Sequence, residues 1–171
     1  MSAQTKVLIG VIATTAFVLG FVFNSGKIEA TESASSLVNA ELGKDDGVVS
    51  VRSQLQRLNL VNFWATWCAP CRHEMPVFES MYQAHNADGF QIIGIAIDNP
   101  ERSQPFLDSM GITYPILYAE RTGMELMETV GNPNGLLPYS LLLDSQGKVL
   151  DQKLGKIDEA DILAWLAEYP N

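Results

Sequence analysis

The sequence is poor in the residues that bind metal ions. Its 171 residues include only two cysteines and two histidines. A structural zinc site needs about four ligands, and His73 and His85 fall in the same expected helix as the second cysteine, Cys71. His73 follows Cys71 by two positions, so we expect its side chain to point elsewhere. The two cysteines, three positions apart, also exclude a general framework of structural disulfides, and we predict no bound metal.

Basic residues are also few. Eleven Lys and Arg stand against twenty Asp and Glu, which gives a net charge of −9 at pH 7. Nucleic-acid binding depends on basic patches that neutralise phosphates, so we expect no nucleic-acid partner. The acidic residues form no long run, which indicates a solvated acidic surface. Apolar residues make up 47% of the chain, enough for one packed domain with an appendage.

Charged residues are absent from residues 7–23, between Lys6 and Lys27. A membrane-spanning helix usually takes about 20 residues, whereas the apolar core of a cleaved signal peptide takes about 7–15. We therefore favour an uncleaved membrane anchor over residues 1–28. A cleaved signal peptide is the alternative, with a passable cleavage site at 28–30. By the positive-inside rule, the chain after the anchor lies on the extracytoplasmic (periplasmic) side, in a single-pass protein of the cytoplasmic membrane.

The rest of the chain divides into a linker and one domain. Residues 29–36 are rich in Ser, Thr, Ala and Glu without a hydrophobic period, which is typical of a flexible linker before a domain at 37–171. Apolar patterns predict strands at 37–42, 47–51, 58–63, 91–97, 115–118, 139–143 and 148–152. They predict helices at 71–85, 100–110, 122–130 and 158–169, the last two capped by Thr122 and Asp158. This order implies an α/β domain with parallel central strands, helices on both faces and a terminal hairpin that makes the sheet mixed.

The two cysteines lie where a buried strand runs into a helix. A thiolate attacks disulfides, yet a free cysteine has a pKa of about 8.5 and is mostly protonated near neutrality. Cys68 at a helix N-terminus would be stabilised as the anion by free backbone N–H groups and the helix dipole. Pro70 suits a first helical turn, and Cys71 lies one turn in. The sequence predicts two steps: Cys68 attacks a partner disulfide, and Cys71 then attacks Cys68 to release the reduced partner.

Other uses of a Cys-x-x-Cys pair remain open but are less favoured. Covalent haem attachment needs a histidine directly after the second cysteine, and Arg72 stands there. A metal site lacks ligands, because the two histidines are the only spare candidates. A purely structural disulfide would close so small a ring that it would add little stability.

Residues 60–76, with Trp67-Cys68-Ala69-Pro70-Cys71 at their centre, resemble the signature of the TlpA/ResA-like family. This family comprises exported, often membrane-anchored, thioredoxin-fold disulfide reductases. The similarity continues through 94–98, 111–115 and 137–144 and covers about residues 37–168. It implies a thioredoxin-like three-layer α/β/α sandwich with a mixed central sheet, preceded by one N-terminal transmembrane helix. It also implies that the redox group is the Cys68–Cys71 disulfide, without a cofactor.

The resemblance implies roles for further residues. Pro138 matches the proline that carries a cis peptide bond opposite the redox pair, leaving the Leu137 backbone free to pair with a substrate chain. An ordinary loop proline is the alternative. Trp67 matches the tryptophan beside the nucleophile, with core packing as the alternative, and Ala69 and Pro70 shape the site between the cysteines. Pro76 matches a proline that kinks the active-site helix.

Glu74 is the charge of most interest near the cysteines. It lies three residues past Cys71, so we expect it on the same helical side, facing the interior. A buried carboxyl has a raised pKa and can exchange a proton with Cys71; a solvated glutamate is the alternative. Ordinary thioredoxins carry a buried Asp where this chain has Asn62, which cannot act as a base. The family commonly has Asn there, so more of the proton transfer is expected of Glu74.

The resemblance implies a reductase of specific protein disulfides, with apocytochrome c cysteines as the substrate hypothesis. Electrons would come from a membrane thiol-transfer protein, because small cytosolic reductants do not reach the outer side of the membrane. A disulfide oxidase or isomerase is the first alternative; strong oxidants of this fold often carry a histidine between the cysteines, where this chain has Ala69-Pro70. A non-catalytic peptide-binding module is the second, and the presence of both cysteines argues against it. A thiol peroxidase would need a differently placed cysteine.

Overall fold

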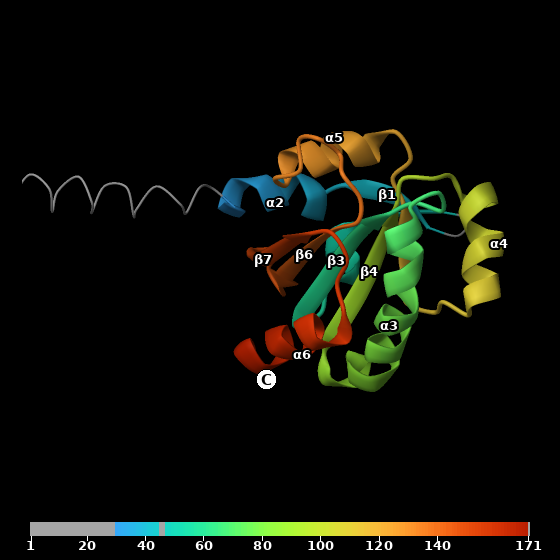
Figure 1. The fold of residues 1–171 in the computed structure, drawn as a ribbon. Coiled ribbons are helices and arrows are strands. Elements are labelled where there is room, and N and C mark those ends of the chain that lie inside the picture. Colours follow the sequence, from blue (N-terminus) through green and yellow to red (C-terminus); the bar gives the residue numbers. More distant parts are fainter. Residues whose placement is uncertain (1–29, 45–46, 171) are drawn as a thin grey trace, which may run out of the picture.

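The computed structural model describes residues 30–44 and 47–170 (Figure 1). Within them lies a seven-stranded sheet in the order β2-β1-β5-β4-β3-β6-β7. Its strands are β1 (Glu41–Lys44), β2 (Gly47–Ser50), β3 (Leu58–Trp64), β4 (Phe90–Ala96), β5 (Ile116–Tyr118), β6 (Tyr139–Asp144) and β7 (Val149–Leu154). The helices are α2 (Ala30–Val38), α3 (Ala69–His85), α4 (Pro100–Met110), α5 (Thr122–Thr129) and α6 (Glu159–Glu168), with short 3-10 turns η1 (Val51–Gln54) and η2 (Asn86–Asp88).

The sheet is mixed, as the sequence predicted. Strand β4 pairs in parallel with β3 and β5, whereas β6 runs antiparallel to β3 and to β7. Every residue of β3 and β4 is buried, because helices cover both faces of the centre of the sheet. The antiparallel register places Asn62 opposite Ser140 on the neighbouring β6, and paired residues point to the same face of the sheet.

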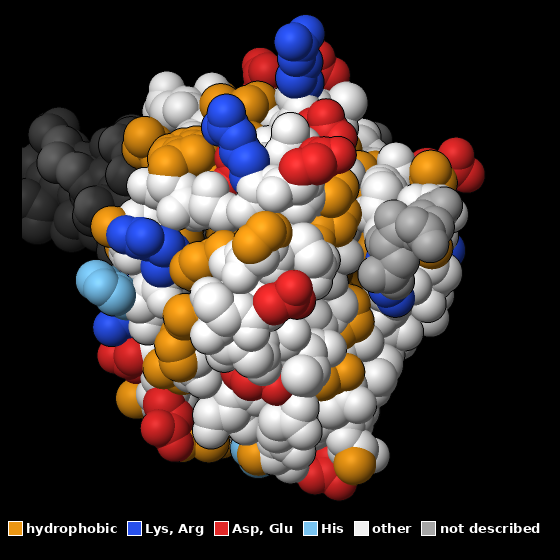
Figure 2. Space-filling view, turned by 90° about the vertical axis from the view of Figure 1, so that its right-hand side faces the viewer, with side chains coloured by type: hydrophobic (Ala, Val, Ile, Leu, Met, Phe, Trp, Pro, Cys, Tyr) orange, Lys and Arg blue, Asp and Glu red, His pale blue; other side chains and the backbone are white. Residues whose placement is uncertain are grey.

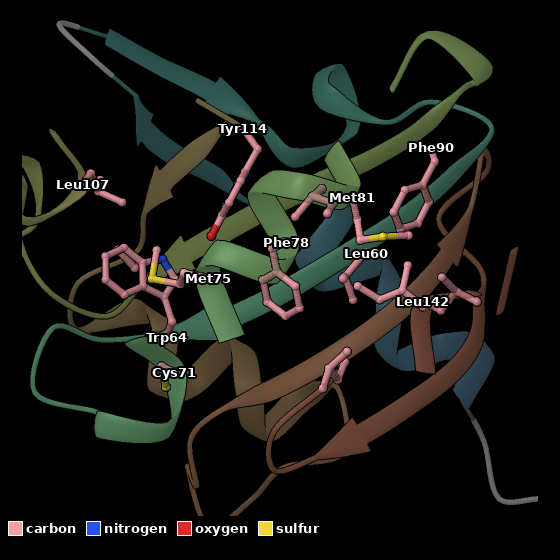
Figure 3. Close-up of a cluster of buried hydrophobic side chains, with 14 of the residues drawn as sticks. Leu60, Trp64, Cys71, Met75, Phe78, Met81, Phe90, Leu107, Tyr114 and Leu142 are labelled. Carbon is pink, nitrogen blue, oxygen red and sulfur yellow. The ribbon is translucent and has the colours of Figure 1, made fainter. Parts of the chain in front are cut away.

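Two hydrophobic clusters fill the two faces of the sheet, so the domain has three layers. The first cluster lies between the sheet and α3, α4 and α6; Figure 3 shows Cys71, Trp64 and Met75 at one end of it and Phe90 and Leu142 at the other. The second cluster lies beneath α2 and α5. On the face drawn in Figure 2, side chains of both charges are spread among apolar strips.

Helix α2 corrects the expectation of a flexible linker at 29–36 and a strand from residue 37. Ala34, Leu37 and Val38 are buried, and their spacing gives a helix one apolar stripe that packs on the domain. The β6–β7 turn fits closely against this stripe, because a Cβ on Gly147 would lie 2.5 Å from a Val38 methyl. Composition alone suggested a linker because the stripe is short and lies among Ser, Thr and Glu.

The other elements agree with prediction to within a few residues, but one cap was wrong. Asp158 caps α6 as expected: its carboxylate accepts from Asp161 N at 3.1 Å, and Asp161 Oδ2 accepts from Asp158 N at 2.9 Å. Thr122 does not cap α5. It is the first helical residue, and its hydroxyl donates to Ala119 O at 2.6 Å.

The structure leaves the membrane segment untested. None of the helices within residues 30–44 and 47–170 is long and apolar enough to cross a membrane. The stretch expected to do so, 7–23, lies outside the described residues.

Candidate functional site

Cys68 and Cys71 form a disulfide at the start of α3, with Cα atoms 5.3 Å apart. Strand β3 ends at Trp64, and the three residues 65–67 bring the chain to Cys68, the N-cap of the helix. There the Cys68 Sγ accepts a hydrogen bond from Cys71 N at 3.3 Å. The N-terminal position predicted from the strand-to-helix transition is therefore confirmed, and a free N–H group of the first turn donates to the sulfur.

The two cysteines differ slightly in exposure. Cys71 is fully buried, whereas Cys68 keeps 5% of its surface exposed at the edge of the domain. Trp67, which precedes Cys68, is 65% exposed, so core packing does not account for it. Ala69 and Pro70, between the two cysteines, are also exposed. A partner molecule approaching the site would meet these three side chains and Cys68 first.

The Leu137–Pro138 peptide bond is cis, as the family resemblance implied. It lies directly before β6, and Pro138 O accepts a hydrogen bond from Gly155 N at 2.9 Å. Leu137 is partly buried and packs against both hydrophobic clusters, the first of which contains Cys68 and Cys71. The structure thus brings the loop before β6 to the same end of the sheet as the cysteines.

Two side chains that the sequence did not single out for this purpose hold that loop. The Asn132 amide pairs with the Leu136 backbone in both directions, donating to its carbonyl at 2.8 Å and accepting from its N–H at 3.2 Å. The Tyr139 hydroxyl donates to Val130 O at 2.6 Å. These bonds connect the end of α5 to the residues on either side of Pro138.

Glu74 is fully buried on the inner side of α3, one turn beyond Cys71. One carboxylate oxygen accepts from Asn62 Nδ2 at 3.0 Å and the other from the Ile157 N–H at 2.9 Å. Burial raises the pKa of Glu74 to about 7, although these two hydrogen bonds and the positive charges of Lys156 and Lys153 pull it down. The solvated alternative is excluded, and the carboxyl changes charge near neutrality.

Asn62 connects Glu74 to a residue that the sequence analysis did not select. Its Nδ2 also donates to the Ser140 hydroxyl at 2.9 Å, and both side chains are buried. The only signal for Ser140 in the sequence was one polar residue in an otherwise apolar strand. Its importance depends on the antiparallel register that sets it opposite Asn62.

Asp98 is a second residue that sequence reasoning missed. It follows β4, is 7% exposed, and its Oδ2 accepts from both the N–H and the hydroxyl of Thr66, at 2.6 and 2.7 Å. Thr66 lies two residues before Cys68, so this carboxylate ties the loop that leads into the redox pair. An acidic residue directly after a buried parallel strand was the available signal, because strand ends meet at one edge of the sheet.

Comparison with known proteins agrees with this geometry. Residues 34–152 match the model of the AhpC/TSA family. The thiol-disulfide oxidoreductase ResA of Bacillus thuringiensis (strain Al Hakam) is 28% identical over 162 residues, covering 94% of this chain and 89% of its own. The thiol:disulfide interchange protein HelX of Rhodobacter capsulatus is 36% identical over 110 residues, 60% of this chain and 55% of its own.

Solved structures support the fold. The crystal structure of StoA from Bacillus subtilis matches 75% of this chain and 98% of its own with a TM-score of 0.60 and 25% identity. This likeness confirms the thioredoxin-like arrangement expected from the sequence, and ResA among the relatives confirms the resemblance to ResA-like proteins. Since the matching family model spans well over half of its length, the chain belongs to the AhpC/TSA family.

Proposed function

We propose that this protein is a protein thiol-disulfide oxidoreductase that reduces specific protein disulfides outside the cytoplasmic membrane. The observation that carries the proposal is the disulfide between the N-cap cysteine Cys68, which keeps 5% of its surface exposed, and the fully buried Cys71 one turn later. The redox group is this disulfide itself, so the reaction needs no cofactor. Relatives named thiol-disulfide oxidoreductase and thiol:disulfide interchange protein support the same chemistry.

The positions of the two cysteines assign them to two steps, because Cys68 caps the helix and keeps some exposed surface, whereas Cys71 is fully buried. In the reduced protein the Cys68 thiolate, stabilised by the N–H groups of the first turn of α3, attacks a partner disulfide and forms a mixed disulfide. The partner's other sulfur leaves as a thiolate. Cys71 then loses its proton and attacks the Cys68 Sγ, which releases the second partner sulfur and restores the Cys68–Cys71 disulfide.

Glu74 is the proposed acceptor of the Cys71 proton. It lies on the same side of α3 as Cys71, and the protein interior surrounds both side chains. With a pKa of about 7, a large fraction of Glu74 is ionised at neutral pH and can take the proton. The variant Glu74→Gln should therefore slow reduction of a disulfide substrate and shift the thiol titrations. Unchanged kinetics and titrations would remove Glu74 from the mechanism.

Trp67, Leu137 and Pro138 are the proposed substrate-facing residues. The exposed indole of Trp67 offers an apolar surface beside Cys68, and the cis bond before Pro138 leaves the Leu137 backbone available to an extended chain. Ala69 and Pro70 complete the approach to the sulfurs. A substrate bound in this way presents its disulfide to Cys68.

We propose that electrons flow from the protein to its substrate, so that the protein acts as a reductase. Ala69-Pro70 between the cysteines supplies no histidine to stabilise the Cys68 thiolate further, as a strong oxidant of this fold often does. A membrane thiol-transfer protein is the proposed electron donor. Equilibration of the disulfide with glutathione buffers measures the reduction potential, and we expect a value below that of the glutathione couple. A value well above it would instead favour an oxidase or isomerase.

The substrate hypothesis is the cysteine pair of apocytochrome c. In the full-length chain in its native membrane, Cys71→Ser should hold the substrate as a mixed disulfide on Cys68, because the resolving thiol is missing. The matched control Cys68→Ser should trap nothing. Identification of the trapped proteins tests the substrate class directly, and a set without apocytochromes would reject it.

A peptide-binding module without catalysis is distinguished by turnover. Wild-type protein should reduce a disulfide in insulin or a model peptide with a thiol donor present, and Cys68→Ser should not. Peptide binding by both proteins without turnover in either would favour the module.

The proposed location depends on the N-terminal segment. We propose that residues 1–28 anchor the protein in the cytoplasmic membrane, with the domain on the extracytoplasmic side. Protein sequencing of the native N-terminus tests this. A start near Thr31 would replace the anchor by a cleaved signal peptide while leaving the domain exported.

A further inference from the structure

The hydrogen bonds of Asn62 use only half of its side-chain amide. Its Nδ2 donates to Glu74 Oε1 at 3.0 Å and to Ser140 Oγ at 2.9 Å. Its Oδ1 is buried and has no hydrogen-bond partner among the residues that the structure describes. A buried acceptor without a donor has lost its hydrogen bonds to water without replacing them, so this oxygen needs an explanation.

Both groups that hydrogen-bond the Glu74 carboxyl in this structure are donors. Asn62 Nδ2 faces one oxygen and the Ile157 N–H faces the other. This arrangement suits a carboxylate, which only accepts. Once Glu74 takes a proton, its new O–H group is a donor and needs an acceptor. An idle acceptor belongs to the amide that already bonds Glu74: the Asn62 Oδ1.

We propose that Asn62 is a positioning residue that partners Glu74 in both protonation states by turning its side-chain amide. With the carboxylate, Nδ2 donates to Glu74 and Ser140, as in this structure. With the carboxylic acid, the amide rotates about its last torsion, so that Oδ1 accepts from the Glu74 O–H. The Ser140 hydroxyl then reverses from acceptor to donor and also bonds Oδ1. A hydroxyl can make this reversal because it carries both a proton and lone pairs.

The proposal rests on the proposed function, in which Glu74 receives the proton of the resolving thiol. In that step the S–H bond of Cys71 breaks and an O–H bond forms on Glu74. The Cys71 Sγ bonds to the Cys68 Sγ, and the bond from Cys68 to the substrate sulfur breaks, so the substrate leaves as a thiolate. Charge therefore moves from the carboxylate to the leaving thiolate, and Asn62 stabilises the newly protonated acid. An Asp at position 62 would place a second carboxylate beside the first.

The other titratable groups facing Glu74 come from three further elements. Lys153 lies on β7 and is bonded to Asp161 at 2.6 Å, and Lys156 lies just before α6. The positive charges of both lysines lower the pKa of the Glu74 carboxyl. Tyr114, before β5, faces it too, and burial raises the pKa of this phenol well above 10. With the cysteines held in the disulfide, Glu74 is the group here that changes charge near neutrality.

The amide signals of Asn62 in the oxidised protein report the rotation without any catalytic assay. Nuclear magnetic resonance would follow the Asn62 side-chain NH₂ and the Glu74 carboxyl carbon between pH 5 and 9. We expect both to titrate with one midpoint, with the NH₂ hydrogen bond to Glu74 present above it and lost below it. In Glu74→Gln the Asn62 signals should no longer titrate. An NH₂ group that keeps its bond to Glu74 across the titration would overturn the proposal.

Kinetics separate this role from simple packing. Asn62→Leu removes both the amide N–H group that donates to the Glu74 carboxylate and the amide oxygen that would accept from the carboxylic acid. Because the hydrogen bond to the charged form is the stronger of the two, the titration midpoint of Glu74 should rise by about one pH unit. A smaller fraction of Glu74 is then ionised at pH 7, so release of the substrate from the Cys68 mixed disulfide should be about fivefold slower than in the wild type. At pH 9 Glu74 is mostly ionised in both proteins, and the two rates should agree within about twofold. In the Glu74→Gln background the same substitution should change the rate less than about twofold. Equal slowing in both backgrounds would make Asn62 a packing residue.

Ser140→Ala provides a milder variant should Asn62→Leu not fold. It should also displace the Asn62 NH₂ signals and the Glu74 midpoint, whereas the matched control Ser103→Ala should displace neither. Ser103 is likewise fully buried, with a hydroxyl that has no partner among the described residues, but it lies on α4. Unmoved signals in Ser140→Ala would count against the proposal. Absence of turnover in the wild type would instead reject the proposed function.

Discussion

Glu74 shows how one buried residue makes stability depend on pH. Its folded-state pKa is about 7 against 4.5 for an ordinary glutamate, because burial disfavours the charged form. Between these two pH values the folded protein binds more protons than the unfolded chain. The contribution of Glu74 to the free energy of unfolding therefore falls as pH rises through this window.

The stability of Glu74→Gln should be less sensitive to pH than that of the wild type. The shift in the Glu74 pKa corresponds to roughly 3 kcal/mol lost between pH 4 and pH 8, which the variant lacks. Urea unfolding of both oxidised proteins at a series of pH values gives this difference. Parallel curves for the two proteins would mean that Glu74 does not titrate in this window.

At this scale the sequence supplied the chemistry of single residues but not all of their partners. Spacing along a helix was enough to place Glu74 behind Cys71. Ser140 and Asp98 are far from the cysteines in sequence, and only the pairing of strands brings them to the site. No local pattern contains that information.

At the scale of elements, the redox pair depends on contacts that hold the ends of strands and helices together. The loop between β3 and α3 is tied to the end of β4 through Asp98, and α3 is tied to the segment before β5 through Glu79. These carboxylates accept hydrogen bonds from backbone groups that regular secondary structure leaves unpaired.

Asp98→Ala should loosen the loop before Cys68. Removing the carboxylate leaves the Thr66 N–H and hydroxyl without their acceptor, at a cost of about 1–3 kcal/mol in unfolding free energy. Hydrogen exchange at the Thr66 amide should accelerate well beyond that of amides in β6. Asp98→Asn retains one oxygen acceptor, so its exchange rate at the Thr66 amide should lie between those of the wild type and Asp98→Ala. Equal exchange rates in the wild type and both variants would mean that Asp98 does not hold this loop.

Glu79→Gln should destabilise the protein at neutral pH but not in acid. Burial alone would raise the pKa of Glu79, but hydrogen bonds from Thr113, Gln83 and Tyr114 together hold it below 4.5. The stabilisation is complete above the unfolded pKa of about 4.5 and is lost as pH falls through the lower folded value. We expect the variant to lose about 1 kcal/mol at pH 7 in urea unfolding, with the difference shrinking at lower pH. The exposed control Glu128→Gln should stay within about 0.5 kcal/mol of wild type throughout.

At the scale of the whole molecule, the segment before the sheet belongs to the domain. Helix α2 lies against α5 and the β6–β7 turn, and α5 leads into the loop that carries Pro138 (Figure 1). The chain that enters the domain is therefore packed onto the layer next to the site.

Leu37→Ala should test this packing. Leu37 is fully buried in the second cluster, so its truncation should lower the unfolding free energy by about 2–4 kcal/mol. The matched control Leu163→Ala, at a side chain 45% exposed on α6, should cost less than about 1 kcal/mol. Urea unfolding of both variants measures the difference, and equal small losses would mean that α2 contributes little.

The sequence by itself determined the redox pair, its place at a helix N-terminus, the mixed sheet and the inward side of Glu74. These follow from local spacing, hydrophobic period and the chemistry of cysteine, which neighbouring residues fix. The tertiary structure alone decided that residues 30–38 form a packed helix, that Asp98 holds Thr66, and that Asn62 bridges Glu74 and Ser140 with one oxygen unused. These depend on strand register and on burial, which arise only when distant segments pack together.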